Sequence, residues 1–110
     1  MKAGDLCKLA IDTINARTEF YRAGGFLDFE NANSVAYTSK SLSERFSKAC
    51  QTSSLGTLDF LKSCLESYYS NRAESEFTIG KYYSDCEGEA IKELLIIIDY
   101  VLDDDKKKIL

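Results

Sequence analysis

The chain has 110 residues, with 14 lysine and arginine residues against 18 aspartate and glutamate residues, which gives a formal net charge of −4 at pH 7. Apolar residues make up 45% and charged residues 29%, a composition typical of a globular domain and not of a disordered or membrane chain. Histidine is absent, which excludes Ser-His and Cys-His nucleophilic sites. We expect one domain over residues 1–110, with a folded surface of roughly 6,000 Å², no enzymatic activity and no cofactor.

The N-terminal part of the chain has the pattern of an amphipathic helix. Apolar residues recur at three- and four-residue steps from residue 5 to residue 23, with charged residues between them. The helix should end at Gly24-Gly25, because glycine is preferred just past a helix C-terminus. Residues 26–37 mix aromatic residues with asparagine and serine, which favours an ordered loop with at most a short helical turn.

Two shorter helices follow, each with a polar residue near its expected start. The sequence from Ser41 to Glu44 can form a capping box for a helix over residues 39–53. The next apolar face predicts a helix over residues 57–72, with Ser54 or Thr57 as its N-cap.

The most hydrophobic segment, residues 85–103, predicts the central helix, with a second possible capping box from Ser84 to Glu87. The run from Leu94 to Ile98 could alternatively be a buried strand, since consecutive isoleucines favour β structure. Helix is favoured because the segment is long for a strand and has charged residues at helical spacing. Residues 73–83 are predicted as a loop with extended character, because a lone strand would have no partner.

These elements predict an all-α fold, an irregular bundle of about four helices. Two longer connections, over residues 24–38 and 73–84, would be ordered by their aromatic side chains.

Four cysteines, Cys7, Cys50, Cys64 and Cys86, form no Cys-x-x-Cys pair and have no histidine to complete a zinc site. The N-terminus leads into a periodic segment and not into a secretory hydrophobic run, so we expect reduced thiols in a cytoplasmic protein. The first three cysteines lie beside apolar residues, which predicts that they pack in or near the core. No stretch approaches the roughly 20 apolar residues of a membrane span.

Acidic residues are concentrated in the last third of the chain. Residues 74–105 contain ten acidic and two basic side chains, whereas residues 1–73 are nearly neutral. Such a field repels phosphate backbones, so we expect no direct binding to nucleic acid. It would attract a basic protein partner and raise the association rate.

Tyr82 and Tyr83 lie within this acidic stretch, just before the last predicted helix. Tyrosine is enriched at interface hot spots, because it combines a large contact area with a hydrogen-bonding hydroxyl group. The alternative is that one ring packs in the core and the other lies along the surface. In that case Glu87 would be a capping partner, and Asp85 and Glu89 would complement the helix dipole.

The segment from Tyr82 to Glu93 reads Tyr-Tyr-Ser-Asp-x-Glu-Gly-x-Ala-Ile-Lys-Glu. It resembles the loop that leads into the final helix of the small four-helix immunity proteins that neutralise bacteriocin nucleases. The size and acidity of the chain also fit the broader set of contact-dependent-inhibition immunity proteins. The resemblance implies a toxin-facing surface that includes Tyr82, Tyr83, Asp85, Glu87 and Glu89.

We therefore predict a non-enzymatic inhibitor that binds and neutralises a basic partner, such as a nuclease toxin, without a metal or cofactor. The alternative is a small regulatory or adaptor protein, including a phage-encoded antagonist, that acts by protein–protein interaction. The predicted partner-binding residues are the acidic and tyrosine side chains of this stretch: Glu74, Glu76, Tyr82, Tyr83, Asp85, Glu87, Glu89 and Glu93.

Overall fold

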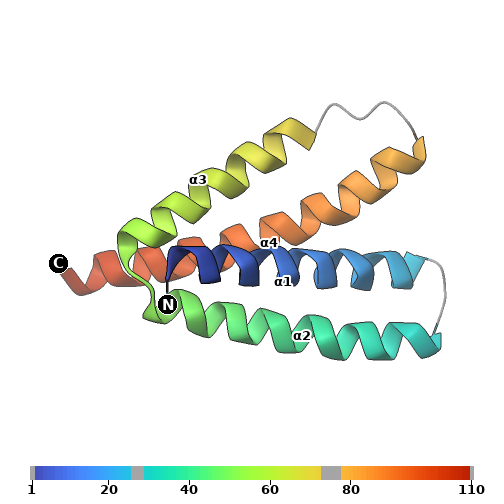
Figure 1. The fold of residues 1–110 in the computed structure, drawn as a ribbon, viewed down its shortest axis with the longest axis horizontal. Coiled ribbons are helices and arrows are strands. Elements are labelled where there is room, and N and C mark those ends of the chain that lie inside the picture. Colours follow the sequence, from blue (N-terminus) through green and yellow to red (C-terminus); the bar gives the residue numbers. More distant parts are fainter. Residues whose placement is uncertain (1, 26–28, 73–77, 110) are drawn as a thin grey trace.

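The computed structural model consists of four α-helices (Figure 1). They are α1 (Ala3–Gly25), α2 (Phe29–Thr52), α3 (Leu55–Arg72) and α4 (Thr78–Ile109). The structure describes the backbone of residues 2–25, 29–72 and 78–109, and the side chains of residues 2–22, 33–70 and 85–103. No strand occurs in these segments, so the predicted all-α class is confirmed and the isoleucine run of α4 is helical. Within the same segments, no helix has the length and apolarity needed to cross a membrane.

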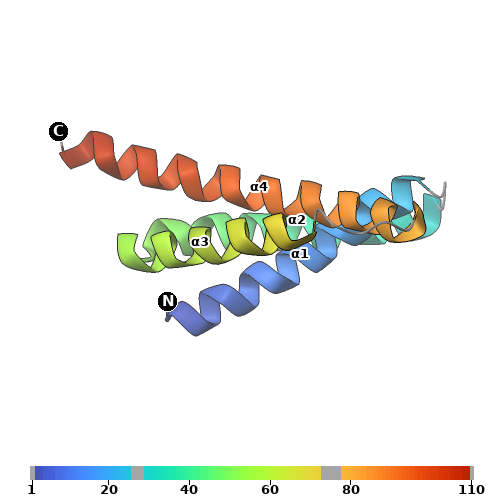
Figure 2. The ribbon, with the colours of Figure 1, turned by 90° about the horizontal axis from the view of Figure 1, so that it is seen from above.

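Helices α1 and α4 make the most varied contacts in the bundle. Each contacts all three other helices, whereas α2 and α3 have little contact with each other. The helices spread apart toward the two termini (Figure 2), and the molecule measures 47 × 31 × 24 Å with a radius of gyration of 14.9 Å, against about 13 Å for a compact chain of this length. The accessible surface of 7383 Å² therefore exceeds the predicted value, and several large apolar side chains remain exposed.

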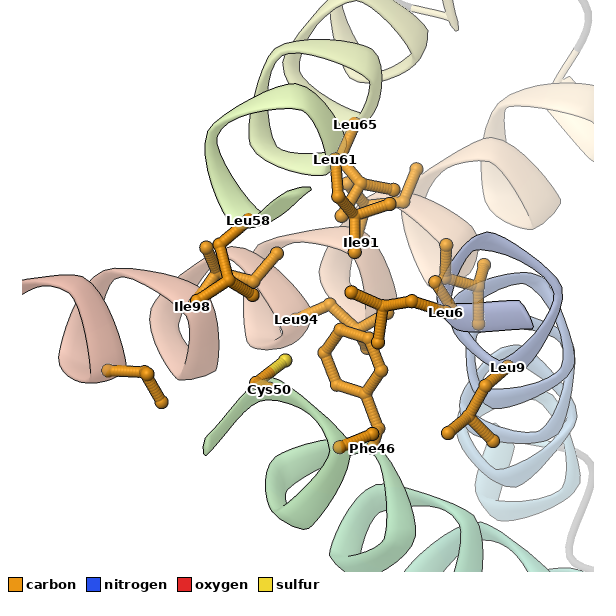
Figure 3. Packing of buried hydrophobic residues seen from close by; sticks show 14 of the residues in the cluster. Leu6, Leu9, Phe46, Cys50, Leu58, Leu61, Leu65, Ile91, Leu94 and Ile98 are labelled. Carbon is orange, nitrogen blue, oxygen red and sulfur yellow. The ribbon is translucent and has the colours of Figure 1, made fainter. Parts of the chain in front are cut away.

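One hydrophobic core joins the four helices (Figure 3). Leu6 of α1, Phe46 of α2, Leu58 of α3, and Leu94 and Ile98 of α4 have no accessible surface. Helix α4 supplies more of the core than any other helix, because a whole face of it is apolar. Its core residues are Ala90, Ile91, Leu94, Ile98, Val101 and Leu102.

Helix α2 begins at Phe29, so the predicted loop over residues 26–37 is wrong from that residue onward. Ser41 consequently lies in the middle of a helix and not at its start. No glycine or proline interrupts residues 29–52, and the preference of asparagine and serine for other conformations is weak enough for packing against α1 to override it. Ser39 is fully buried in that contact. The rest of the predicted loop, residues 26–28, is outside the described residues.

Helix α4 also begins earlier than predicted, at Thr78, and ends later, at Ile109. The expected extended loop is therefore wrong for residues 78–83, and Ser84 lies inside the helix. A glycine within a helix costs about 1 kcal/mol, so Gly80 does not prevent helix formation in a segment of 32 residues that packs on three others. The rest of that predicted loop, residues 73–77, is outside the described residues.

Helix α3 begins at Leu55, two residues before the predicted start, and of the two predicted caps, Ser54 and Thr57, it is Ser54 that caps it. The hydroxyl oxygen of Ser54 accepts a hydrogen bond from the backbone N–H of Thr57 at 3.2 Å. This satisfies one of the amide groups that a helix N-terminus leaves without an internal partner.

All four cysteines are free thiols. Cys50 and Cys86 are buried and Cys7 is half-buried, but Cys64 is exposed on α3, so the prediction that Cys64 packs near the core is wrong. Burial disfavours the thiolate and raises the pKa of the Cys50 thiol to about 12.

Substitutions at Ile98 and Ile96 test the orientation of α4, because the two isoleucines lie on opposite sides of one helix. Ile98 is fully buried and Ile96 is 67% exposed. We expect Ile98→Ala to lower the free energy of unfolding by about 3 kcal/mol through lost burial and a cavity, and Ile96→Ala to change it by less than about 0.5 kcal/mol. Urea denaturation followed by circular dichroism measures both. Equal losses for the two variants would mean that α4 is rotated differently.

Candidate protein-binding surface

Half of the predicted partner-binding residues cannot be assigned to a surface. Glu74 and Glu76 are outside the described residues. Tyr82 and Tyr83 belong to the first turns of α4 and not to a loop before it, and their side chains are not described.

The other four predicted residues point away from α4 in different directions. Asp85 and Glu89 are exposed and one helical turn apart on the outer face. Glu87 is half-buried on the side toward α3, where its carboxylate accepts a hydrogen bond from the hydroxyl group of Tyr68 at 2.7 Å. Glu93 is partly buried where α4 faces α1. The structure therefore keeps two of these acids together on an open surface.

A row of exposed side chains continues from Asp85 along the outer face of α4, at steps of three and four residues. We call this row the outer stripe. Both of its ends are acidic, and Ile96 and Tyr100, which are 67% and 74% exposed, lie between them. Its members are Asp85, Glu89, Lys92, Ile96, Tyr100 and Asp103.

An open hollow of about 620 Å³ lies beside the outer stripe, between α2 and α4. Ile96 and Ile97 line it from α4, Lys40 and Glu44 from α2, and Phe20 from α1. A hollow next to exposed apolar side chains can receive a side chain of a partner, which is the usual environment of a binding hot spot.

The electrostatic field of this part of α4 is negative. Residues 85–103 contain six acidic residues and one lysine. That lysine, Lys92, is held by Tyr69 of α3 and by Glu89, whose carboxylate lies 3.3 Å from the ammonium group, and both contacts raise the pKa of Lys92. Asp99 forms an ion pair at 2.7 Å with Lys62 of α3 and raises the pKa of that lysine.

Glu93 takes part in a polar cluster that links three helices. The Arg17 guanidinium group donates from Nε to Oε2 at 2.6 Å and from Nη2 to Oε1 at 2.7 Å. The same guanidinium group donates to the hydroxyl oxygen of Ser39 on α2 at 2.9 Å, and the Tyr21 hydroxyl group donates to Glu93. The Glu93 carboxylate thus joins α4 to α1, and Arg17 extends the link to α2, so we leave Glu93 out of the candidate surface.

The charges in this cluster stabilise each other. Burial opposes ionisation of Glu93, but hydrogen bonds from Arg17 and Tyr21 outweigh it and lower the pKa of the carboxyl group. The hydrogen bond to Glu93 raises the pKa of Arg17. Burial, and then the adjacent Glu93, raise the pKa of the Tyr21 hydroxyl group. All three groups therefore keep their ordinary charge states at neutral pH.

Ile96 and Tyr100 were not predicted as site residues, although the sequence contains a signal for them. Both residues fall outside the spacing that joins Leu94, Ile98 and Val101 on the buried face. A large apolar residue off that spacing in a long helix must point away from the core. Helical periodicity alone would therefore have found the exposed apolar pair.

Replacing Glu93 with glutamine tests the structural role of the cluster. Because the pKa of Glu93 is lowered in the folded state, the ion pair stabilises the fold above about pH 4.3, the ordinary value of a glutamate, and this contribution is lost as the pH falls through the folded-state pKa. We expect Glu93→Gln to lower the free energy of unfolding by about 1.5 kcal/mol at neutral pH, and this difference from wild type to shrink in acid. Urea denaturation across the pH range measures it.

The matched control is Glu89→Gln, which removes an exposed carboxylate from the same helix. It should change stability by no more than about 0.5 kcal/mol at any pH. A difference between wild type and Glu93→Gln that stays constant down to acid pH would contradict the assigned ion pair.

Comparisons of this chain with protein-family models, curated proteins and solved structures give no match. The resemblance to immunity proteins therefore rests on residues 82–93 alone.

Proposed function

We propose that this protein is a non-enzymatic inhibitor of the immunity type, which binds a basic partner, such as a nuclease toxin, through the outer stripe of α4. The observation that carries the proposal is the exposure of Ile96 and Tyr100 between acidic side chains on the central helix. Neither residue belongs to the hydrophobic core. They lie one helical turn apart and so form a continuous apolar patch, which in this proposal is covered by the partner.

The two parts of the outer stripe have different tasks in this proposal. Burying a side chain such as isoleucine contributes about 1.5–3 kcal/mol, and tyrosine is among the residues that most often dominate binding energy. Ile96 and Tyr100 thus provide affinity. Asp85, Glu89 and Asp103 attract a basic partner over a longer range and raise its association rate.

The irregular bundle around α4 serves as a support for this surface. The Arg17–Glu93 pair and the apolar core together fix the rotation of α4, so the outer stripe is held ready for binding. A surface that is ordered before binding loses little conformational entropy in the complex. The free thiols suit a reducing compartment, and we place the protein in the cytoplasm.

Binding kinetics of stripe variants test the proposed surface once the partner has been isolated from the source lysate. Reversal of Asp85 and Glu89 to lysine should slow association and remove most of its salt dependence, because these charges act at long range. Tyr100→Ala should raise the dissociation rate and cost about 2 kcal/mol or more. The matched control is Tyr37→Ala. Tyr37 is 78% exposed on α2, away from the outer stripe, so this substitution should change neither the association rate nor the dissociation rate.

An activity assay of the isolated partner separates the inhibitor from the alternative function. An inhibitor abolishes the partner's activity at a one-to-one ratio, and the Tyr100→Ala variant needs a higher concentration to do so. Binding through the same residues with the partner's activity unchanged would support a regulatory or adaptor protein. Unchanged binding in all stripe variants, with the helical spectrum intact, would place the interface elsewhere.

A further inference from the structure

A second feature of the molecule lies away from the outer stripe, between α1 and α3. These two helices have few contacts with each other, and a cavity of about 400 Å³ separates them. This volume lies within the range of pockets that bind small organic molecules, about 300–1,000 Å³. The cavity is therefore large enough for a ligand.

Most of the surface of the cavity is apolar. Ile14 of α1 and Leu61 and Leu65 of α3 are buried residues of the core that also line the cavity. Ile11 lines it from the edge of α1 and is 58% exposed. A ligand in the cavity would cover this isoleucine, which has no place in the core. The lining therefore favours a ligand whose main part is apolar.

The polar groups of the lining gather at one end. Helices α1 and α3 run in the same general direction (Figure 1), so Asn15 and Tyr68, the last lining residues of each helix, are both at the end away from Cys7 and Leu61. Glu87 of α4 is at this end too, because it accepts the hydrogen bond of the Tyr68 hydroxyl group. One end of the cavity is apolar, and the other contains a carboxylate, an amide and a phenol.

The charge of the polar end selects the ligand. Among the described residues that line the cavity none is basic, and Glu87 is the acidic one. An anionic head group would be repelled by Glu87 and by the net charge of −4. A protonated amine can donate charge-assisted hydrogen bonds to the Glu87 carboxylate and to the Asn15 amide oxygen.

We propose that the cavity between α1 and α3 is a binding site for a small amphipathic organic cation, with its apolar body between Ile14, Leu61 and Leu65 and its amine at Glu87. The site is independent of the proposed inhibitor function, because it uses none of the residues of the outer stripe. It also assigns Glu87 a different role from Asp85 and Glu89, since Glu87 points toward α3.

Three probes with the same alkyl chain test the proposal: octylamine, octanol and octanoate, titrated by calorimetry near neutral pH. Octylamine is protonated under these conditions, as an alkylamine of pKa about 10.4 must be. We expect octylamine to bind about tenfold or more tightly than octanoate, with octanol between them, a preference of about 1.4 kcal/mol. Equal affinities for octylamine and octanoate, or no saturable binding of octylamine, would overturn the proposal.

Substitutions assign the amine to Glu87. Glu87→Gln should reduce octylamine affinity about tenfold and leave octanol affinity unchanged, since only the charge is removed. Glu89→Gln, which removes an exposed carboxylate of the outer stripe, is the matched control and should leave both affinities unchanged. An equal loss in the two variants would mean that octylamine responds to the overall charge and would overturn the assignment. Circular dichroism checks that each variant is folded.

Thiol labelling of Cys64 and a cavity-filling substitution at the same position locate the ligand. Cys64 is exposed and also lines the cavity, so iodoacetamide should alkylate it in the free protein and much more slowly with octylamine bound. Cys64→Phe should fill the cavity with a ring and abolish octylamine binding. Binding of octylamine without protection of Cys64 would place it elsewhere. If instead the wild-type chain self-associates and Cys64→Phe abolishes that self-association, the cavity is the contact site for a second copy of the chain. That result would also overturn the proposal.

Discussion

The burial of one face of α4 against the other three helices is the interaction on which the rest of the structure depends. Ile91, Leu94 and Ile98 of this face have no accessible surface, and they meet Leu6 of α1 and Phe46 of α2 in one core. Because α2 and α3 hardly contact each other, each of them is held chiefly through α1 and α4. The rotation that buries this face also determines which residues of α4 face outward, so the core and the outer stripe are two results of one constraint.

The Arg17–Glu93 pair adds a polar link to this apolar interaction. A partly buried ion pair adds little stability over a well-packed apolar pair, since desolvation offsets much of the attraction, but removal of one partner is costly because it leaves the other charge unpaired. The bidentate hydrogen bonding of Arg17 to Glu93, and the hydrogen bond from Arg17 to Ser39, nevertheless define how α1, α2 and α4 are aligned along their axes. The outer stripe that we propose for function relies on this alignment, because it needs α4 to be fixed against α1 and α2. The cavity depends instead on the spacing between α1 and α3.

The sequence predicts the apolar faces well, because helical periodicity reports burial directly, and all four predicted helices are present. Their boundaries are less predictable, since the first part of α2 has polar residues that become helical only through contacts with α1, and Gly80 is a weak helix breaker. The role of Glu93 could not be predicted from the sequence, because its partner Arg17 is 76 residues away. No local pattern separates a carboxylate in a structural ion pair from one on the surface. The cavity depends on the separation of two helices, which no sequence pattern contains.

Hydroxyl-radical footprinting of the free protein, read out residue by residue with mass spectrometry, tests the two-faced character of α4 most directly. The structure predicts rapid oxidation of Ile96 and Tyr100 and strong protection of Leu94 and Ile98, although all four residues lie within two turns of one helix. Similar oxidation of Ile96 and Ile98, or protection of Tyr100 in the free protein, would show that α4 has no exposed apolar stripe and would contradict the account.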